Sequence, residues 1–395
     1  MSAHRQTPSA DYPANADGSN TSSASSYKRV VSKVGTSLLT GGTRRLNMDI
    51  MAGLVAQIAQ LHAEGKQMLL VSSGAVAAGR HALGITREDK NTPQRQVLAA
   101  VGQSHLMHAY EQLFATHDIP VAQALLSRRD LTDRLGYLNI RNTLEGLLDH
   151  SVVPIINEND VVAVEELAGE AFGDNDTLSA LVANLVDADL LVMLGEVEGL
   201  YTADPFMDSS ACHIPVVEHL TEDDVERLGG PSRGSRGRGG MRTKLEAARL
   251  ATASGVDVVI AGGHIPKVIE QLVAGKNIGT SFPTSTTRLE SRKRWMLSGV
   301  STRGEILVDS GAVSALRNKN RSLLPAGVTA VVGIFERGDI IAILDGDRSQ
   351  LACGISNYGS EDLSAIKGEN SNLISEMLGH HYGDEIVHRN NMVIL

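Results

Sequence analysis

The sequence predicts an α/β protein in which a mostly parallel sheet is sandwiched by helices and followed by a small, β-barrel-like C-terminal domain. Over residues 27–282, short apolar runs alternate with amphipathic helical segments, which is typical of a parallel sheet covered on both faces. After Trp295 the apolar runs are separated by tight turns, as in a small barrel with one or two helices. The chain of 395 residues, 42% of them hydrophobic, is also long enough for two or three domains of roughly 100–200 residues.

The elements of the larger domain can be assigned in chain order. Residues 27–33 are expected to form the first strand, followed by an amphipathic helix that Asn47 caps and Gly65 ends. Residues 68–71 indicate a second buried strand, and Thr92-Pro93 opens a long helix with proline at its first position. Further strands are expected at residues 121–126, 152–156, 190–194 and 256–260, and helices at residues 177–186 and 241–253.

The remaining segments differ in composition from this domain. Residues 1–26 are polar, rich in Ser, Ala and Asn, and without apolar periodicity or targeting features, so we expect them to be disordered. Residues 283–294 indicate a polar linker, and the C-terminal domain is expected over residues 295–395. Its strands are predicted at residues 305–308, 328–335, 339–344 and 351–356.

Charge and cysteine content restrict the class of protein. The 36 basic and 46 acidic residues give a net charge of −10, and aromatic residues make up 3%, which disfavours a general grip on nucleic acid. Cys212 and Cys353 form no metal-binding or redox motif, and we interpret them as reduced thiols. No apolar stretch reaches the roughly 18–20 residues that span a bilayer. We therefore expect a soluble cytoplasmic protein without a membrane partner.

Ligands of parallel α/β sheets bind beyond the carboxyl ends of the strands, so the residues after each apolar run are the candidates. Lys33 ends the first strand, with Gly35 close behind it, and could hold the phosphates of ATP, although the Walker A spacing is absent. Ser73 follows the second strand and opens a helix, whose N-terminus suits a substrate carboxylate. The alternatives are a solvated lysine at a strand end and a plain serine N-cap.

Acid and amide side chains form a further candidate site. Asn157 and Asp160 follow the strand at residues 152–156, and Asn175 and Asp176 precede a predicted helix. Asparagine both donates and accepts hydrogen bonds and aspartate accepts from an ammonium, which matches the α-amino and carboxylate groups of an amino acid. Asp176 as a helix N-cap is the structural alternative. Charges at strand ends are costly to bury without a partner, which favours a ligand.

The last candidate is the glycine-rich loop at residues 237–244, GRGGMRTK, which leads into a helix with Lys244 in its first turn. Backbone donors, a helix start and a lysine together suit a phosphate group. A flexible, solvated basic loop that contains Arg238 and Arg242 is the alternative.

Taken in this order, the segments resemble the amino acid kinase family, and among its members those that phosphorylate glutamate and carry a C-terminal PUA domain. The resemblance runs from about Lys28 to the C-terminus. It rests on VSKVGTS, SSGAVAAGR, VPIINENDVV, FGDNDTLSALVA, GLYTADP and GGMRTK, and in the tail on GEILVDSGAVSAL, SLLPAGV and GISNYGSEDL.

The resemblance implies that ATP, with Mg²⁺ on its phosphates, phosphorylates the side-chain carboxylate of L-glutamate. Lys33 and Lys244 would contact the transferred phosphoryl group and the nucleotide, and Asp176 would orient the two lysines. No side chain is assigned as a metal ligand. The residues implied to bind glutamate are Ser73, Asp160, Asn175 and, nearby, Asn157. The residues implied to lie along the nucleotide are Lys33, Gly195, Glu196, Arg238, Gly239, Gly240, Met241, Arg242, Thr243 and Lys244.

Two positions depart from the family pattern. The family usually has Ser or Thr followed by Asp where this chain has Gly195 and Glu196, and usually Thr where it has Arg238. Both positions face the nucleotide by analogy, so the departures concern contacts to the base or ribose, whereas the phosphate lysines are retained.

The resemblance also implies partners. Proline is the expected feedback inhibitor, a homo-oligomer such as a tetramer is expected, and the labile acyl phosphate would pass to glutamyl phosphate reductase in proline synthesis. The alternatives are another small carboxylate or carbamate kinase of this fold, a kinase fold kept for regulation without catalysis, and an RNA-binding accessory protein suggested by the PUA-like tail. The acidic pI of about 5.7 argues against the RNA-binding alternative.

Overall fold

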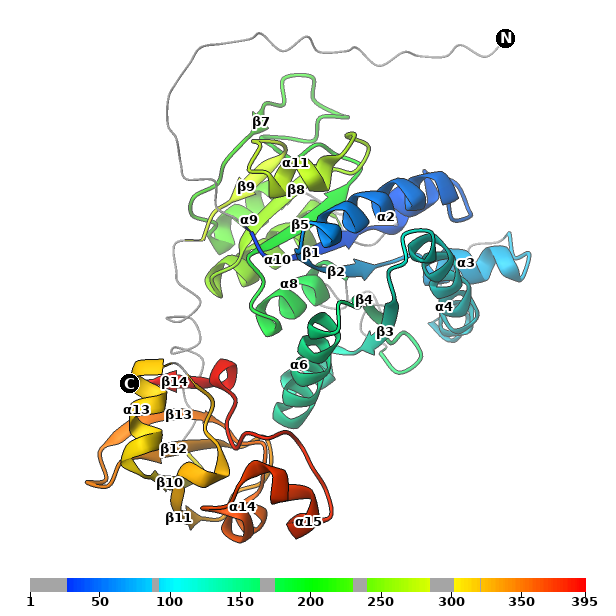
Figure 1. Cartoon of the computed structure of the whole chain (residues 1–395). Coiled ribbons are helices and arrows are strands. Elements are labelled where there is room, and N and C mark those ends of the chain that lie inside the picture. The colour runs from blue at the N-terminus through cyan, green and yellow to red at the C-terminus, as the bar shows by residue number, and fades with distance from the viewer. Residues whose placement is uncertain (1–26, 87–91, 164–174, 230–239, 285–301, 320) are drawn as a thin grey trace, which may run out of the picture.

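The computed structural model describes residues 27–86, 92–163, 175–229, 240–284, 302–319 and 321–395. Figure 1 shows a larger domain, in which helices cover a central sheet, and a smaller C-terminal β domain beside the free end of helix α6. The expected disorder of residues 1–26, most of the expected linker and the start of the expected C-terminal domain lie outside the described residues.

The larger domain is built on a sheet that, within the described ranges, has seven strands in the order β3-β4-β2-β1-β5-β8-β9. Neighbouring strands from β3 to β8 run parallel, and β9 is antiparallel to β8. The predicted parallel sheet is therefore confirmed. The strands are β1 (Arg29–Val34), β2 (Gln67–Ser72), β3 (Val121–Leu126), β4 (Val153–Glu158), β5 (Leu190–Gly195), β8 (Asp257–Gly262) and β9 (Thr280–Phe282). A separate short hairpin pairs β6 (Leu200–Tyr201) with β7 (His213–Ile214).

Each face of the sheet carries its own hydrophobic core because successive side chains of a strand point to opposite faces. In β1, Val30 and Val34 belong to one core and Val31 to the other. Helices α1 (Thr36–Thr40), α2 (Met48–Ala63), α3 (Ala75–Ala82), α4 (Thr92–Ala115) and α11 (Val268–Val273) contribute to the first core. Helices α5 (Arg128–Thr132), α6 (Arg134–Asp149), α8 (Asn175–Leu185), α9 (Glu222–Gly229) and α10 (Met241–Ala253) contribute to the second.

The helix boundaries follow the local signals in the sequence with one informative difference. Asn47 caps α2, because its side-chain oxygen accepts from the backbone N–H groups of Asp49 and Ile50 at 3.1 and 3.2 Å. Helix α4 begins at Thr92 and α10 spans the predicted residues. Helix α8 begins at Asn175, two residues earlier than predicted, so Asp176 lies inside its first turn.

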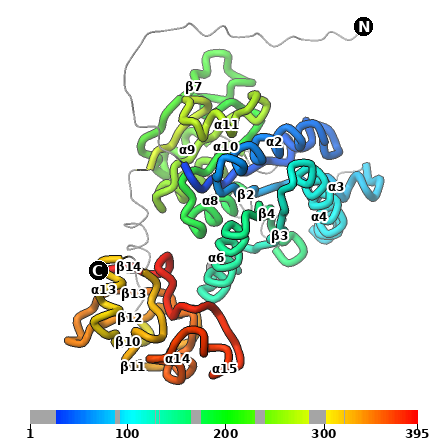
Figure 2. The backbone as a smooth tube through the Cα atoms, viewed as in Figure 1, coloured from blue at the N-terminus to red at the C-terminus, as the bar shows by residue number. Residues whose placement is uncertain are grey.

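Helices α3 and α4 pack against each other with their backbones in close contact, as the tube in Figure 2 also shows. A Cβ atom on Gly79 would lie 1.8 Å from the carbonyl oxygen of Leu98, and one on Gly102 would lie 1.8 Å from that of Ala75. Only glycine fits these positions. The contact fixes α4 beside the start of α3, directly after Ser73.

The C-terminal domain is a separate sheet with its own core, in the strand order β11-β10-β12-β13-β14. The predicted strands are present with shifted ends, and β14, which was not predicted, pairs with β13. The strands are β10 (Gly304–Val308), β11 (Val328–Gly333), β12 (Ile340–Leu344), β13 (Gln350–Ile355) and β14 (Met392–Ile394). The helices are α13 (Ser310–Lys319), α14 (Ser360–Ile366), α15 (Ile374–Leu378) and the 3-10 turns Pro325–Gly327, Ser371–Leu373 and Arg389–Asn391.

Helix α6 connects the two domains. Leu138 on α6 is fully buried in a small cluster with Ile340, Cys353, Ile355 and Val393 of the C-terminal sheet. Polar contacts flank this cluster, from Arg134 to Asp339 at 3.5 Å and from the Asn390 amide to Glu145 at 3.2 Å. Within the described residues, the C-terminal sheet is thus docked on the larger domain through α6. Across the part of the chain that is described, no helix is both long and apolar enough to cross a membrane.

Candidate active site

Three charged side chains from three elements meet at the carboxyl edge of the sheet. Lys33 is near the end of β1, Asp176 in the first turn of α8 and Lys244 in the first turn of α10. The Lys33 ammonium lies 2.5 Å from one Asp176 oxygen, and the Lys244 ammonium lies 2.9 Å from the other. The structure therefore brings together two lysines that are distant in the sequence. The alternatives of a solvated Lys33 and of Asp176 as a helix N-cap do not describe these contacts.

The charges in this cluster are removed from solvent. The Asp176 side chain has no exposed surface, and those of Lys33 and Lys244 are 4% and 12% exposed. Burial by itself would raise the pKa of Asp176, but the ammonium groups of Lys244 and Lys33 outweigh it and lower that pKa below its usual range. Asp176 is therefore a carboxylate at neutral pH.

A threonine, a glycine and a helix start lie beside this charged cluster. Thr243 donates a hydrogen bond of 2.8 Å to Asp176, in addition to the two lysine contacts. Gly195 ends β5 next to Lys244, where a Cβ atom would lie 3.5 Å from the lysine Cε. Gly240 precedes the N-terminus of α10, whose unpaired N–H groups carry partial positive charge. Two ammonium groups and a helix start form a donor set that suits a polyphosphate.

A second, uncharged cluster adjoins the first through the neighbouring residue Asn175. The Asn175 amide nitrogen donates to the Ser73 hydroxyl at 3.0 Å and to the Asn157 side-chain oxygen at 3.1 Å. The Asn157 amide nitrogen donates to Gln103 of α4 at 2.8 Å. Asn157 and Asn175 are buried, and within the described part of the chain the Asn175 oxygen Oδ1 has no hydrogen-bond partner. An unpaired buried acceptor is costly, which favours a ligand group as its partner.

Other predicted residues lie differently. Asp160 is partly exposed in the turn after β4. Met241 packs against the second hydrophobic core, and Arg242 pairs with Glu246 at 3.1 Å on the outer side of α10. Glu196 is exposed at the end of β5. Arg238 and Gly239 lie outside the described residues.

In the described ranges, no group of three or more metal-binding side chains occurs. The described part of the site therefore has no preformed set of metal ligands. Asp176 already has two lysines and a threonine as partners. A Mg²⁺ ion on this site would therefore be held through phosphate oxygens rather than by that carboxylate.

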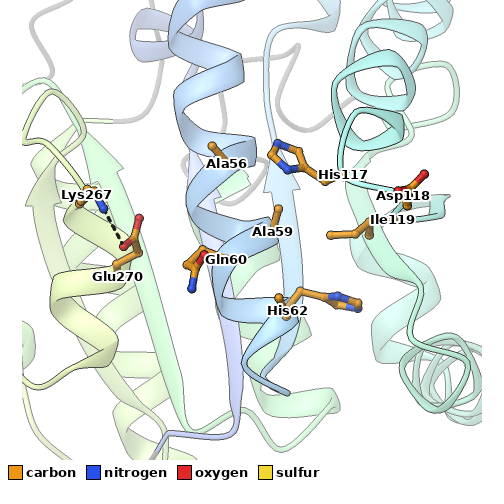
Figure 3. Close-up of a pocket in the computed structure, with 10 residues that line it drawn as sticks. Ala56, Ala59, Gln60, His62, His117, Asp118, Ile119, Lys267 and Glu270 are labelled. Carbon is orange, nitrogen blue, oxygen red and sulfur yellow. Dashed lines mark ion pairs between the residues drawn. The ribbon is translucent and has the colours of Figure 1, made fainter.

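A cavity of about 790 Å³ lies at the other end of the sheet and shares no residue with the site. Figure 3 shows the outer face of α2, with Ala56, Ala59 and Gln60, between the Lys267–Glu270 ion pair of α11 and the residues that precede β3. His62, which also lines it, contacts the carbonyl oxygen of Ser151 before β4 at 3.0 Å.

Gln103 was not predicted as a site residue. It lies in the middle of a long helix and belongs to no motif. The adjacent Gly102 is the available signal, because a glycine inside a helix marks a close backbone approach, here of α4 to α3.

Comparisons with known proteins agree with this geometry. The model of the amino acid kinase family matches residues 28–262, and that of the PUA domain matches residues 304–378. A glutamate 5-kinase of Dehalococcoides mccartyi strain CBDB1 is 52% identical over 369 residues, which cover 93% of this chain and 99% of that protein. A glutamate 5-kinase of Herpetosiphon aurantiacus is 50% identical over 93% of this chain and 98% of that protein. A glutamate 5-kinase of Deinococcus radiodurans is 47% identical over 93% of this chain and 100% of that protein.

Among solved structures, UMP kinase from Bacillus anthracis aligns with 66% of this chain and 97% of its own, with a TM-score of 0.45 and 17% identity.

Proposed function

We propose that Lys33, Lys244 and Asp176 carry the phosphoryl transfer of this chain, which belongs to the amino acid kinase family and, within it, to the glutamate 5-kinases. The chain uses ATP to phosphorylate the side-chain carboxylate of L-glutamate, giving L-glutamyl 5-phosphate in the first step of proline biosynthesis. The meeting of the buried Lys33 and the partly buried Lys244 on one buried carboxylate supports the proposal most directly.

The reaction needs positive charge more than it needs a base. A glutamate side chain with a pKa near ~4.3 is already ionised at neutral pH, so its oxygen can attack the γ-phosphorus without losing a proton. The new oxygen–phosphorus bond forms as the bond to the β–γ bridging oxygen breaks, and ADP leaves with that electron pair. The obstacle is repulsion between two anions, roughly 4 kcal/mol per unit pair at ~4 Å with an effective dielectric of ~20. Lys33 and Lys244 offset this repulsion and stabilise the charge on the transferred group.

Asp176 acts on the lysines rather than on the substrate. Its two oxygens accept from Lys33 and Lys244, so one carboxylate holds both ammonium groups at the same place. A buried pair of lysines without this counter-charge would repel each other and lose their common orientation.

The adjoining amide cluster is proposed to bind glutamate. One hydrogen-bonded group next to the lysines contains Ser73, Asn157 and Asn175. Asp160 lies just after β4, the strand that contains Asn157. Asn175 and Asp176 are consecutive, so a substrate held at the amide cluster would have its far end close to the lysine pair. This spacing fits an amino acid with a carboxylate at the end of its side chain.

The nucleotide is proposed to lie along the end of β5 and the start of α10. Gly195 and Gly240 leave the backbone accessible there, and Lys244 is adjacent. Mg²⁺ would neutralise part of the phosphate charge when bound to ATP. Arg242 points to Glu246, so we propose that it contributes through its backbone rather than its side chain.

The remaining partners are proposals from the family relationship. Proline is proposed as the feedback inhibitor, glutamyl phosphate reductase as the acceptor of the labile product, and a homo-oligomer, a tetramer, as the assembled form. We also propose a cytoplasmic location. A salt-dependent gel shift with RNA tests whether the PUA domain binds RNA.

Trapping the acyl phosphate with hydroxylamine tests the proposal. The wild-type protein is expected to form the hydroxamate only when glutamate, ATP and Mg²⁺ are all present. Lys33→Ala and Lys244→Ala are expected to lower kcat by about 100-fold or more, with a much smaller change in the glutamate KM, because they remove charge that acts on the transition state. Lys276→Ala, an exposed lysine on the surface after α11, is the matched control. An unchanged kcat in both site variants would refute the assigned roles.

A further inference from the structure

The amide cluster has a defined hydrogen-bond polarity that begins at a backbone group. The N–H of Glu158 donates to the Asn157 side-chain oxygen at 2.9 Å. A backbone N–H can only donate, so this contact identifies the oxygen end of the Asn157 amide. The nitrogen end then points to Gln103, whose side-chain oxygen accepts from it at 2.8 Å. Asn157 is 2% exposed, so water cannot replace either partner freely.

The polarity of Asn157 determines that of Asn175. Because the Asn157 oxygen is an acceptor, Asn175 must present its amide nitrogen to it, at 3.1 Å. The second hydrogen of the same nitrogen goes to the Ser73 hydroxyl oxygen at 3.0 Å. Both amide hydrogens of Asn175 are therefore used, and its oxygen Oδ1 is left as a buried acceptor with no hydrogen-bond partner among the described residues.

The cluster thus presents one acceptor and one donor to a ligand. The Asn175 oxygen can accept from a cationic group, and the Ser73 hydroxyl, whose oxygen already accepts, keeps its hydrogen for an anionic group. An ammonium and a carboxylate on neighbouring atoms satisfy both, as in a free α-amino acid. A ligand without the ammonium would leave the Asn175 oxygen buried and unsatisfied, which selects strongly against it.

We infer that Gln103 is a positioning residue that maintains this polarity, and that through it the site selects substrates with a free α-ammonium. The inference rests on the proposed glutamate site. Gln103 lies on α4 and need not touch the substrate, because its effect passes through Asn157 to Asn175. Without the Gln103 side-chain oxygen, the buried Asn157 nitrogen loses its acceptor. Rotation of the Asn157 amide away from Asn175 then becomes favourable, because it can bring that nitrogen to another acceptor.

Calorimetric binding of L-glutamate and of glutarate, which has both carboxylates but no ammonium, tests the inference. The measured quantity is the ratio of the two Kd values, since it cancels changes that affect both ligands equally. Gln103→Met removes the acceptor at similar size and is expected to reduce the preference for glutamate by about 10-fold or more. Gln103→Glu keeps an acceptor and is expected to stay within about 3-fold of wild type. Gln112→Met, the same change at an exposed position of α4, is the control.

The outcomes separate this inference from the proposed function. A wild-type protein that forms no hydroxamate from glutamate and ATP contradicts the proposed function itself. If wild type forms the hydroxamate but binds glutamate and glutarate equally well, the assignment of Asn175 as an ammonium acceptor is wrong. If Gln103→Met keeps the wild-type preference, or if Gln103→Glu loses as much as Gln103→Met, Gln103 does not act as an acceptor for Asn157. Thermal unfolding of each variant checks that it is folded.

Discussion

Asp176 is the residue on which the site depends most, since it is a buried charge with two oppositely charged partners. Leaving buried charges without their partner commonly costs about 3–5 kcal/mol. Asp176→Asn keeps the size of the side chain but leaves Lys33 and Lys244 facing a neutral group. We expect kcat to fall by about 100-fold or more. The free energy of unfolding is expected to fall by about 3–5 kcal/mol. Steady-state kinetics and urea unfolding measure the two effects, with Asp223→Asn, an exposed acid on α9, as control.

The pH dependence of the same variant has a definite sign. The pKa of Asp176 is lowered from its ordinary value of 3.8 in the folded state, because the two lysines outweigh burial. The carboxylate therefore stabilises the fold at pH values above about 4, and this contribution is lost as the pH falls from there through the lowered folded pKa. The stability difference between wild type and Asp176→Asn should shrink as the pH is lowered below about 4. A difference that grows toward acid pH would contradict the lowered pKa.

Single residues also show how far sequence reasoning reaches. Lys33, Lys244 and Asp176 were selected from a strand end, a glycine-rich loop, a polar cluster and the resemblance to the amino acid kinases. The structure places both lysines on Asp176, and their catalytic roles stay predictions. Gln103 was not identifiable, since glutamine in the middle of a helix is common and its role depends on contacts with β4. Met241 shows the opposite case: it belongs to a motif, yet its side chain packs into the core.

Among the secondary-structure elements, the pair α3 and α4 controls the position of the amide cluster. Ser73 lies two residues before Ala75, the first residue of α3, and Gln103 lies on α4. The two helices touch through Gly79 and Gly102. A Cβ atom on Gly102 would lie 1.8 Å from the Ala75 carbonyl oxygen, which is backbone and cannot swing away. The distance between Ser73 and Gln103 therefore depends on Gly79 and Gly102 having no Cβ atom.

Gly102→Ala is expected to destabilise the protein by about 1–3 kcal/mol and to raise the glutamate KM, because α4 must move away from α3. Gly53→Ala is the matched control, a helical glycine on α2 with no atom within 4 Å of the added carbon. It is expected to stabilise by about 0.5–1 kcal/mol, since alanine has the better helix propensity. Urea unfolding of both variants gives the two signs. If both variants change the free energy of unfolding equally, α4 can move away from α3 at little cost.

The positions of the elements were largely predictable, and their ends were not. Apolar periodicity identified β1, β2, α2 and α10, because each has one face fixed by burial. The earlier start of α8 at Asn175 was missed, since the sequence placed that residue in a polar cluster that does not look helical. β14 was missed because its three residues are too short for a periodic signal.

At the scale of the whole molecule, α6 links the two domains through side-chain contacts between described residues. Its buried Arg141 binds Asp187 at 2.6 Å and the carbonyl oxygen of Leu185, both at the C-terminal end of α8. Leu138, on the same helix, is buried against the C-terminal sheet. The C-terminal domain is therefore connected through α6 to the helix whose first turn carries Asp176. Sequence patterns could not predict this docking, because it joins residues that lie far apart in the sequence, such as Glu145 and Asn390.

The two cysteines make the docking measurable. Cys353 is 2% exposed within the interdomain cluster, and burial raises the pKa of its thiol, whereas Cys212 is exposed. In a Cys212→Ser background, Cys353 should therefore react slowly with a thiol reagent. Leu138→Asp places a charge in the cluster and is expected to speed the reaction by about 10-fold or more, since a buried unpaired charge is costly and separates the two surfaces.

Leu135→Asp, on the same helix at a residue that is already 41% exposed, is the control and should leave the rate near that of wild type. If Cys353 still reacts slowly with the thiol reagent in the Leu138→Asp variant, the C-terminal sheet shields this thiol without α6. Kinetics of the same variants then show how far turnover depends on the docking.

Asn175 and Asp176 are joined by a single peptide bond, and one faces the amide cluster while the other holds the lysines. A rotation or slip of the α8 N-terminus must displace both together. Choice of acceptor and rate of turnover are for that reason mechanically coupled in this protein. Attempts to redesign it for a different acceptor should leave the start of α8 untouched and alter the surrounding walls instead.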